Sequence, residues 1–213
     1  MQHTKLFQVH DLGLIDYDMA YEAQMSILQT ILEGAESTVI FCEHPPVVTC
    51  GRLSKKENIL GTLADFQKKG VTMKQIDRGG DVTLHAPGQL VIYTIFDLAH
   101  FGKDLHAFLH ALEDVVLGVL GDFQIAARRH NGNTGVWADS RKIASLGIGV
   151  KKWISYHGIG LNVNTDLELF KLINPCGLGV EMTSMQQIKG APVDMEEVKK
   201  SAVRNFNRVF KLV

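Results

Sequence analysis

The chain contains 213 residues, of which 46% are hydrophobic and 21% are charged, and its net charge is −1. This length and composition are typical of a single globular domain, so we expect residues 1–213 to form one domain whose core needs no disulfides. A charge this close to zero produces no overall field that would attract nucleic acid or a membrane surface, and we expect neither as a partner.

The first half of the chain alternates between short strands and helices. Asp16 is a suitable N-cap and Gly34 a suitable stop for a helix whose apolar residues recur every three to four positions. Pro45 and Pro46 force an extended path between two strands. In chain order we expect a strand near Leu6–Val9, a helix over Asp16–Glu33, a strand at Thr38–Cys42, a short strand after Pro46, a helix over Thr62–Lys69 and a strand at Val71–Asp77.

The second half opens with Leu90–Phe96, an almost continuous apolar run that is typical of a central strand. Leu105–Leu120 has the periodicity of an amphipathic helix. Lys142–Val150 and Trp153–Val163 are separated by only two lysines and predict an antiparallel hairpin. This mixture of hairpins and helices indicates an α/β or α+β layered fold with a mixed sheet. We also expect a short strand at Val136–Ala138 and a C-terminal helix over Asp194–Lys211, with Asp194 and Glu197 as a capping box.

Cysteine usage and the N-terminus indicate the cellular compartment. Three cysteines, an odd number without the spacing of a disulfide framework, suit a reducing environment. No basic start precedes an apolar block, and no 18 consecutive apolar residues occur, so we expect neither a signal peptide nor a membrane span. We therefore expect a cytoplasmic protein. Cys42 lies in an apolar strand, and we expect it and Cys50 to be buried, unreactive thiols.

Cys176 differs from the other two cysteines because Pro175 and Gly177 place it in a loop. A nucleophilic thiol needs a nearby cation or base that lowers its pKa from about 8.5. Lys142 opens a predicted strand, and a lysine at a strand edge is, without further information, expected to face solvent. The residues alone do not select among the candidate activators, which are His85, His130, Arg141, Lys142 and His157.

Two glycine-rich segments, RGGD at 78–81 and HAPGQ at 85–89, flank a short strand. Glycine permits tight turns, which is the default interpretation, and it also lets a backbone approach a ligand closely. Neither segment is a phosphate-binding P-loop. On facing strands, the glycines of 147–149 and 158–160 would leave a groove free of side chains in which an acyl chain could lie.

A metal site is not expected. His106 and His110 are four residues apart on a predicted helix, with Glu113 nearby, and this spacing could hold zinc. However, Ala107 stands where a metalloprotease has its glutamate. The three side chains also share the polar side of an amphipathic helix, so we expect them to lie on the surface.

Four ordered blocks, RGGDVTLHAPGQLVIYTIFDL, KIASLGIG, HGIGLNVNTDL and INPCG, together resemble the octanoyltransferase family of lipoate biosynthesis, and EHPPVVTCGR upstream is similar to that family too. The resemblance implies the catalytic fold shared with biotin and lipoate protein ligases, a mixed sheet with flanking helices and a smaller second sheet. It also implies a reaction, the transfer of an octanoyl group from acyl carrier protein to a specific lysine of lipoyl-domain proteins.

The same resemblance implies roles for individual residues. Cys176 aligns with the family's acyl-thioester nucleophile and Lys142 with its thiol-activating lysine. Leu84 and Ala86 depart from the family pattern TYHGPGQ, and both are expected to touch the acyl pocket. The substrate-binding segments align with Arg78, Gly79, Gly80, Asp81, Val82, Thr83, Leu84 and His85, with Ser145, Leu146 and Gly147, and with Gly158, Ile159 and Gly160.

The implied mechanism needs no cofactor, because a thioester is already activated for acyl transfer. The implied partners are octanoyl-acyl carrier protein as donor, and the lipoyl domains of 2-oxoacid dehydrogenase complexes and the glycine cleavage H protein as acceptors. A local basic rim would suit an acidic carrier, and we expect it at Arg128, Arg129, Arg141, Lys151 and Lys152. Three alternatives stay open: an ATP-dependent lipoate or biotin ligase, a cysteine hydrolase using His85 or His157, and a carrier-binding module without activity.

Overall fold

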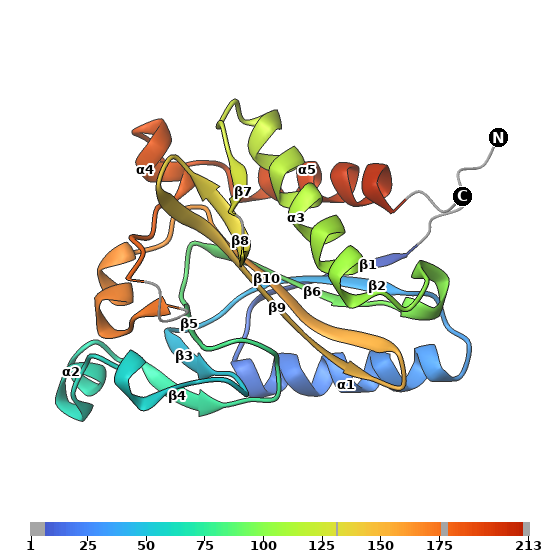
Figure 1. Ribbon diagram of the computed structural model, residues 1–213, viewed down its shortest axis with the longest axis horizontal. Helices are drawn as coiled ribbons and strands as arrows, with labels where there is room; N and C mark the ends of the chain where they lie inside the picture. Colours follow the sequence, from blue (N-terminus) through green and yellow to red (C-terminus); the bar gives the residue numbers. More distant parts are fainter. Residues whose placement is uncertain (1–6, 131, 176–178, 211–213) are drawn as a thin grey trace.

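The computed structural model describes residues 7–130, 132–175 and 179–210, which form two β-sheets and the helices around them (Figure 1). The larger sheet has seven strands in the order β1-β2-β6-β10-β9-β8-β7, and the smaller has three in the order β4-β3-β5. In the larger sheet the strands are β1 (Gln8–Leu14), β2 (Thr38–Glu43), β6 (Gln89–Ile95), β10 (Ile154–Asn162), β9 (Arg141–Lys151), β8 (Asn133–Ala138) and β7 (Arg128–His130).

The larger sheet is mixed, as expected. β1 runs parallel to β2, and every other described pair in this sheet is antiparallel. β9 and β10 form the predicted hairpin, closed by the pair Lys151 and Ile154. Every residue of β6 and β10 is buried, because helices cover both faces of these central strands. This explains why the sequence of β6 is an almost continuous apolar run instead of alternating.

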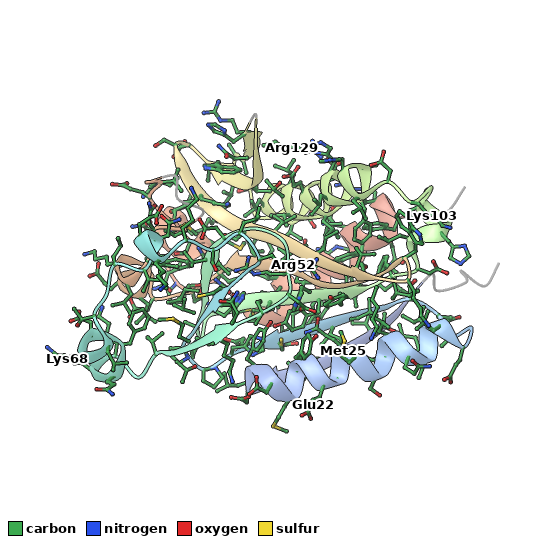
Figure 2. All side chains as sticks on the ribbon, turned by 60° about the horizontal axis from the view of Figure 1, so that its bottom comes forward. Glu22, Met25, Arg52, Lys68, Lys103 and Arg129 are labelled. Atoms are coloured by element: carbon green, nitrogen blue, oxygen red, sulfur yellow. The ribbon has the colours of Figure 1, made fainter. Side chains whose placement is uncertain are left out.

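Helices form a layer on each face of this sheet (Figure 1). α1 (Tyr17–Leu32) packs on β6 and β10 through an apolar stripe that includes Ala20, Leu28 and Ile31. α3 (Leu105–Asp122) and α5 (Met195–Val209) pack on the opposite face and against each other. Glu22 extends from the outer side of α1 into solvent, as amphipathicity requires (Figure 2).

The smaller sheet contains β3 (Val47–Cys50), β4 (Thr72–Gln75) and β5 (Val82–His85), with β3 parallel to β4 and antiparallel to β5. Its core is filled from two sides, by Phe66 of α2 (Leu63–Lys68) and by Phe170 and Leu172 of a 3-10 helix, η3 (Leu167–Leu172). The other short helices are η1 (Lys56–Asn58), η2 (Leu98–Phe101) and α4 (Met185–Lys189).

Two local expectations need correction. The first strand runs from Gln8 to Leu14, beyond Leu6–Val9, because its parallel pairing with β2 fixes its extent although its side chains are largely exposed. Asp194 caps α5 through the N–H groups of Glu196 and Glu197, whereas the reciprocal capping box is found at Thr62 and Asp65 of α2.

Across the described ranges, no helix has the length and apolar character needed to cross a membrane.

Candidate active site

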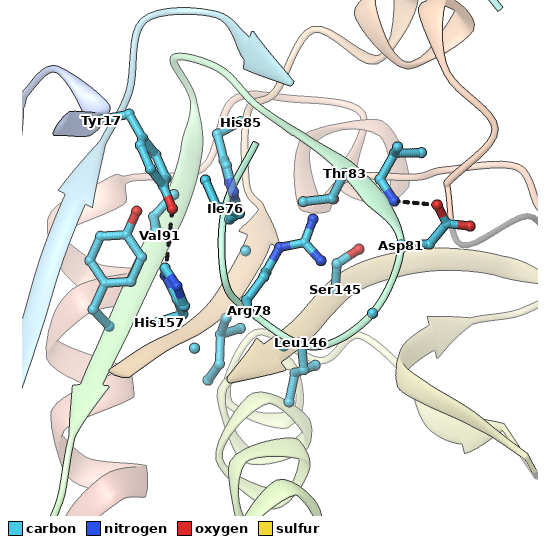
Figure 3. A pocket seen from close by; sticks show the side chains of 17 residues that line it. Tyr17, Ile76, Arg78, Asp81, Thr83, His85, Val91, Ser145, Leu146 and His157 are labelled. Carbon is cyan, nitrogen blue, oxygen red and sulfur yellow. Dashed lines mark hydrogen bonds between the residues drawn. The ribbon is translucent and has the colours of Figure 1, made fainter. Parts of the chain in front are cut away.

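A cavity of about 510 Å³, including its open mouth, lies between the smaller sheet and strands β6, β9 and β10 of the larger one (Figure 3). The part of this space in which a water-sized sphere fits measures about 50 Å³, so the cavity is narrow. Three chain segments that are far apart in sequence meet there, namely those around 78–85, 145–147 and 158–160. Of the fourteen predicted substrate-binding residues, twelve line the cavity: Arg78, Gly80, Asp81, Val82, Thr83, His85, Ser145, Leu146, Gly147, Gly158, Ile159 and Gly160.

The other two predicted residues lie elsewhere. Gly79 lines a neighbouring, more open depression. Leu84 is fully buried in the core of the smaller sheet, and Ala86 belongs to the same core, so neither residue lines this cavity. Ala86 also needs no positive φ. Gly88 takes the positive φ of this turn, 84°, and a Cβ there would lie 2.5 Å from the carbonyl oxygen of Asn164.

The glycines of β9 and β10 make room for neighbouring backbone, at Gly147 and Gly158, or for side chains, at Gly149 and Gly160, instead of leaving an open groove. Gly147 and Gly158 are direct partners in the hairpin register. A Cβ on Gly147 would lie 3.1 Å from the carbonyl oxygen of Gly79, and the N–H of Gly79 donates to the carbonyl of Ile148 at 2.9 Å. The 78–80 loop therefore rests on β9, and the expected groove is a covered cavity.

Arg78 places a fixed positive charge in the cavity wall. Its guanidinium donates to the carbonyl of Thr49 at 2.8 Å and to that residue's hydroxyl at 3.1 Å, so the side chain is held against β3. Figure 3 shows the guanidinium pointing into the cavity near Thr83 and Ser145. A charge at this position can bind a polar group of a substrate, while both aliphatic and polar residues line the remainder of the wall.

His157 forms one end of a polar network beside the cavity. Its Nε2 lies 3.0 Å from Asp77, whose other oxygen accepts from the Tyr156 hydroxyl at 2.7 Å and the Tyr21 hydroxyl at 3.2 Å. The hydrogen bond from His157 is the main cause that holds the pKa of Asp77 well below its usual range, and burial lowers the pKa of His157. The two lowered pKa values describe a neutral His157 imidazole that donates a hydrogen bond to an ionised Asp77 carboxylate.

His85 is also neutral near pH 7. Burial is the main cause that lowers its pKa to about 3, and its Nδ1 lies 2.7 Å from the side-chain oxygen of Gln89. A neutral imidazole supplies no positive charge that would lower the pKa of a thiol. His85 and His157 are therefore poor candidates for a cationic thiol activator.

Lys142 is almost completely buried, with 1% of its surface exposed, so the solvent-facing position expected for it is wrong. It lies on β9 opposite Trp137 of β8, and its Nζ is 4.9 Å from the centre of that indole ring. Nζ donates to the carbonyl of Thr134 at 3.1 Å. Lys142 lines the depression next to the cavity, and the two share Gly80, Asp81, Leu146 and Gly147.

Two of the three cysteines, Cys42 and Cys50, lie within the described residues. Cys176 lies outside the described residues. Cys42 and Cys50 are buried, as expected, and burial is the main cause that raises the pKa of each thiol, which disfavours a reactive thiolate. Asn174, two residues before Cys176, lines the same depression as Lys142.

The expected basic rim is not one surface. Arg129 is paired with Glu113 and Asp114 of α3. Lys151 and Lys152 lie at the turn of the hairpin, at the opposite end of β9 from Arg141, which is roughly 30 Å along an extended strand. Charges this far apart cannot act as one rim.

Sequence patterns did not predict several residues of the site. Tyr17, Ile76, Val91 and Tyr93 also line the cavity, and no local pattern distinguishes them from ordinary core residues. Glu113 was expected on the surface but is buried, with 3% of its surface exposed. The only signal for Glu113 was its place beside the apolar stripe of a helix.

Comparisons with known proteins show the family to which the chain belongs. The family described as the lipoyl protein ligase A/B catalytic domain matches residues 16–207. Octanoyltransferase from Geotalea uraniireducens is 46% identical over 191 residues, covering 89% of this chain and 86% of that protein. Octanoyltransferase from Syntrophobacter fumaroxidans is 42% identical over 203 residues, covering 94% of this chain and 89% of that protein.

Solved structures share the fold at low sequence identity. Lipoate-protein ligase A bound with ATP superposes with a TM-score of 0.80 at 16% identity, covering 96% of this chain and 85% of that one. Biotin protein ligase from Aquifex aeolicus gives 0.55 at 13% identity, covering 98% and 70%. The predicted fold class is confirmed.

Proposed function

The chain belongs to the octanoyltransferase family, within the lipoyl protein ligase A/B catalytic domains, and on that premise we propose that it carries the octanoyl group as a thioester on Cys176, with Lys142 as the proton donor and acceptor. It is an acyltransferase of protein lipoylation. We also propose that residues 1–213 make up one catalytic domain, in line with the family match over residues 16–207.

One observation carries the assignment of Lys142. Its ammonium is buried in the wall of a depression that adjoins the cavity, and Asn174, close to Cys176 in sequence, lines that depression too. A buried ammonium within a few ångströms of a thiol lowers the thiol pKa by roughly 1–3, which makes a thiolate abundant near neutral pH. His85 and His157, both neutral, cannot provide that effect.

The first half-reaction then forms the acyl-enzyme. The Cys176 thiolate attacks the thioester carbonyl of the donor, a new sulfur–carbon bond forms, and the bond to the donor thiol breaks. The Lys142 ammonium gives its proton to the departing thiolate. In the second half-reaction, a neutral acceptor amine attacks the acyl-enzyme, an amide bond forms, and the amine's proton passes to Lys142. The thiolate and the ammonium are both restored, so protons balance over one turnover.

The proposed donor is octanoyl-acyl carrier protein, and the proposed acceptor is the lysine of a lipoyl domain, including those of 2-oxoacid dehydrogenase complexes and the H protein. An archaeal lipoate protein ligase with the same fold has been solved as a system with its E2 lipoyl domain, which supports an acceptor of this kind. The exposed surface of the cavity is mostly apolar, and Ile76, Val82, Val91, Leu146 and Ile159 contribute to it, which suits contact with an octanoyl chain.

Intact-mass measurement tests the proposal. Wild-type protein mixed with octanoyl-carrier protein in the absence of ATP should gain one octanoyl group, and peptide mapping should locate it on Cys176. Cys176→Ala should gain none, whereas Cys42→Ala should be acylated normally. Transfer that proceeds only with ATP would instead identify a ligase, and steady release of free octanoate without amide formation would identify a hydrolase. Binding of the carrier without acylation would leave only a binding module.

A further inference from the structure

A single peptide group connects Lys142 to a buried acid on another element. The Nζ of Lys142 donates to the carbonyl of Thr134 at 3.1 Å, and the next N–H, that of Gly135, donates to Glu113 at 2.9 Å. This C=O and this N–H belong to the same peptide, and in a trans peptide they point in opposite directions. The Glu113 carboxylate and the Lys142 ammonium therefore face opposite ends of one peptide group.

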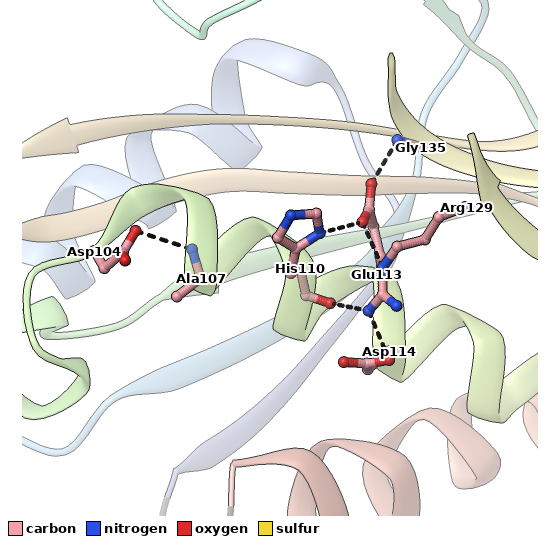
Figure 4. A network of polar contacts seen from close by, with 7 residues as sticks. All are labelled: Asp104, Ala107, His110, Glu113, Asp114, Arg129 and Gly135. Carbon is pink, nitrogen blue, oxygen red and sulfur yellow. Dashed lines mark hydrogen bonds and ion pairs between the residues drawn. The ribbon is translucent and has the colours of Figure 1, made fainter. Parts of the chain in front are cut away.

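Glu113 is held firmly in place (Figure 4). It projects from α3, and its second oxygen accepts from Arg129 Nε at 2.9 Å and from His110 Nδ1 at 3.0 Å. Arg129 also pairs with Asp114 and donates to the backbone carbonyl of His110. A buried carboxylate is costly unless it is paired and hydrogen-bonded, so these contacts fix the oxygen that receives the Gly135 N–H.

The lysine packs directly on the peptide that Glu113 holds. A Cβ built on Gly135 would lie 2.6 Å from Lys142 Cε and 3.1 Å from Nζ. The pairing of β8 with β9 is irregular at the next residues, Val136 and Trp137, so the ordinary strand ladder does not fix this peptide by itself. A shift of the peptide would therefore move the ammonium with it.

We propose that Glu113 is a positioning residue for Lys142 and acts through the Thr134–Gly135 peptide. Its carboxylate fixes the direction of the Thr134 carbonyl, and it polarises the peptide so that the carbonyl becomes a stronger acceptor for the ammonium. A catalytic side chain works only if surrounding groups hold its geometry within about 0.5 Å. The effect on catalysis rests on the proposed function of Lys142, whereas the effect on the position of its ammonium does not.

Trp137 offers a direct readout of that position, because the Lys142 ammonium lies over its ring. The chain has two tryptophans, so Trp153→Phe leaves Trp137 as the single tryptophan, whose emission can be excited selectively over that of tyrosine. In this background Lys142→Met sets the emission change caused by loss of the cation. We expect Glu113→Gln to change the Trp137 emission in the same direction. Asp122→Asn is the matched control, since Asp122 on the same helix accepts hydrogen bonds from Ser201, Arg204 and Asn205 of α5.

Steady-state kinetics give the functional readout. A displacement of about 1 Å can cost about 100-fold in rate, so Glu113→Gln should lower kcat by about 10- to 100-fold while KM for donor and acceptor stays within about twofold. Asp122→Asn should keep both constants. If Glu113→Gln does not fold, Glu113→Asp, which is one methylene too short to reach the Gly135 N–H, replaces it with the same expected results.

An unchanged Trp137 emission in the Glu113 variant would overturn the inference. So would an equal emission change in Asp122→Asn, because the effect would then be a general loss of packing. A wild-type kcat in Glu113→Gln beside an inactive Lys142→Met would overturn its catalytic part. Full activity in Lys142→Met would instead refute the proposed function, while the emission result would still decide whether Glu113 positions the lysine.

Discussion

Replacing Gly135 with alanine should displace Lys142 without touching its charge. The new methyl would lie 2.6 Å from Lys142 Cε and 2.9 Å from the carbonyl oxygen of Ala144. Because carbon atoms in contact are normally about 3.5–4.0 Å apart, the lysine end must move by about 1 Å. The φ of 142° at this position adds strain of about 1–3 kcal/mol for a residue with a side chain.

We therefore expect Gly135→Ala to lose about 1–3 kcal/mol in urea unfolding and up to about 100-fold in kcat, measured where the variant is fully folded. Gly121→Ala is the matched control. Gly121 lies in α3 with nothing within 4 Å of the added methyl, so stability should rise by up to about 1 kcal/mol and kcat should not change. A kcat for Gly135→Ala within about twofold of wild type would refute the geometry inferred for Lys142.

Three further predictions address the catalytic groups and the response to pH. Cys176→Ala should abolish acyl transfer, whereas Cys42→Ala and Cys50→Ala should retain it in a transfer assay. Lys142→Arg should keep rapid iodoacetamide labelling of Cys176 but lose amide formation, because a guanidinium cannot release its proton. Lys142→Ala should lose both rapid labelling and amide formation. An unchanged pH profile of labelling in Lys142→Ala would argue against Lys142 as the activator of the thiol. The pKa of His85 in the folded protein is about 3, below its ordinary value of 6.5. The neutral, buried form therefore contributes fully to the free energy of unfolding above pH 6.5. That contribution is lost as the pH falls toward 3, at up to about 1.4 kcal/mol per pH unit. His85→Gln should flatten that slope in urea unfolding, and an equal slope in both proteins would count against a buried neutral His85.

Local sequence patterns predicted most elements of the fold. The Asp16 cap, the helical periodicity of α3 and the β9–β10 hairpin are each signalled by residues close in sequence, and the structure confirms all three. The hairpin turn is one residue later than expected, at Lys152 and Trp153. The extent of β1 was missed because pairing with β2 decides it, and its exposed edge carries little apolar pattern.

The candidate site was predictable only in part, and for a similar reason. The ordered glycine-rich blocks identified three segments that meet at one cavity. The burial of Lys142 was not predictable, because it depends on tertiary contacts: its Nζ lies over the Trp137 ring, and its backbone bonds to Glu181 and Thr183 from a distant part of the chain. Glu113 was misplaced because a polar residue beside an apolar stripe normally faces solvent, and only the tertiary partners Arg129 and Gly135 make its burial favourable.

The segment between β4 and β5 restricts how the two sheets can move relative to each other. Asp77 accepts hydrogen bonds from Tyr156 and His157 of β10, and Gly79 donates to Ile148 of β9. The same segment is bound to the smaller sheet through Arg78 and Thr49. A hinge opening would break several of these bonds at once, each contributing about 0.5–3 kcal/mol. With the cavity assigned to the acyl chain as proposed above, the chain would enter and leave lengthwise through a mouth of fixed width, and the depth of the cavity would limit its length.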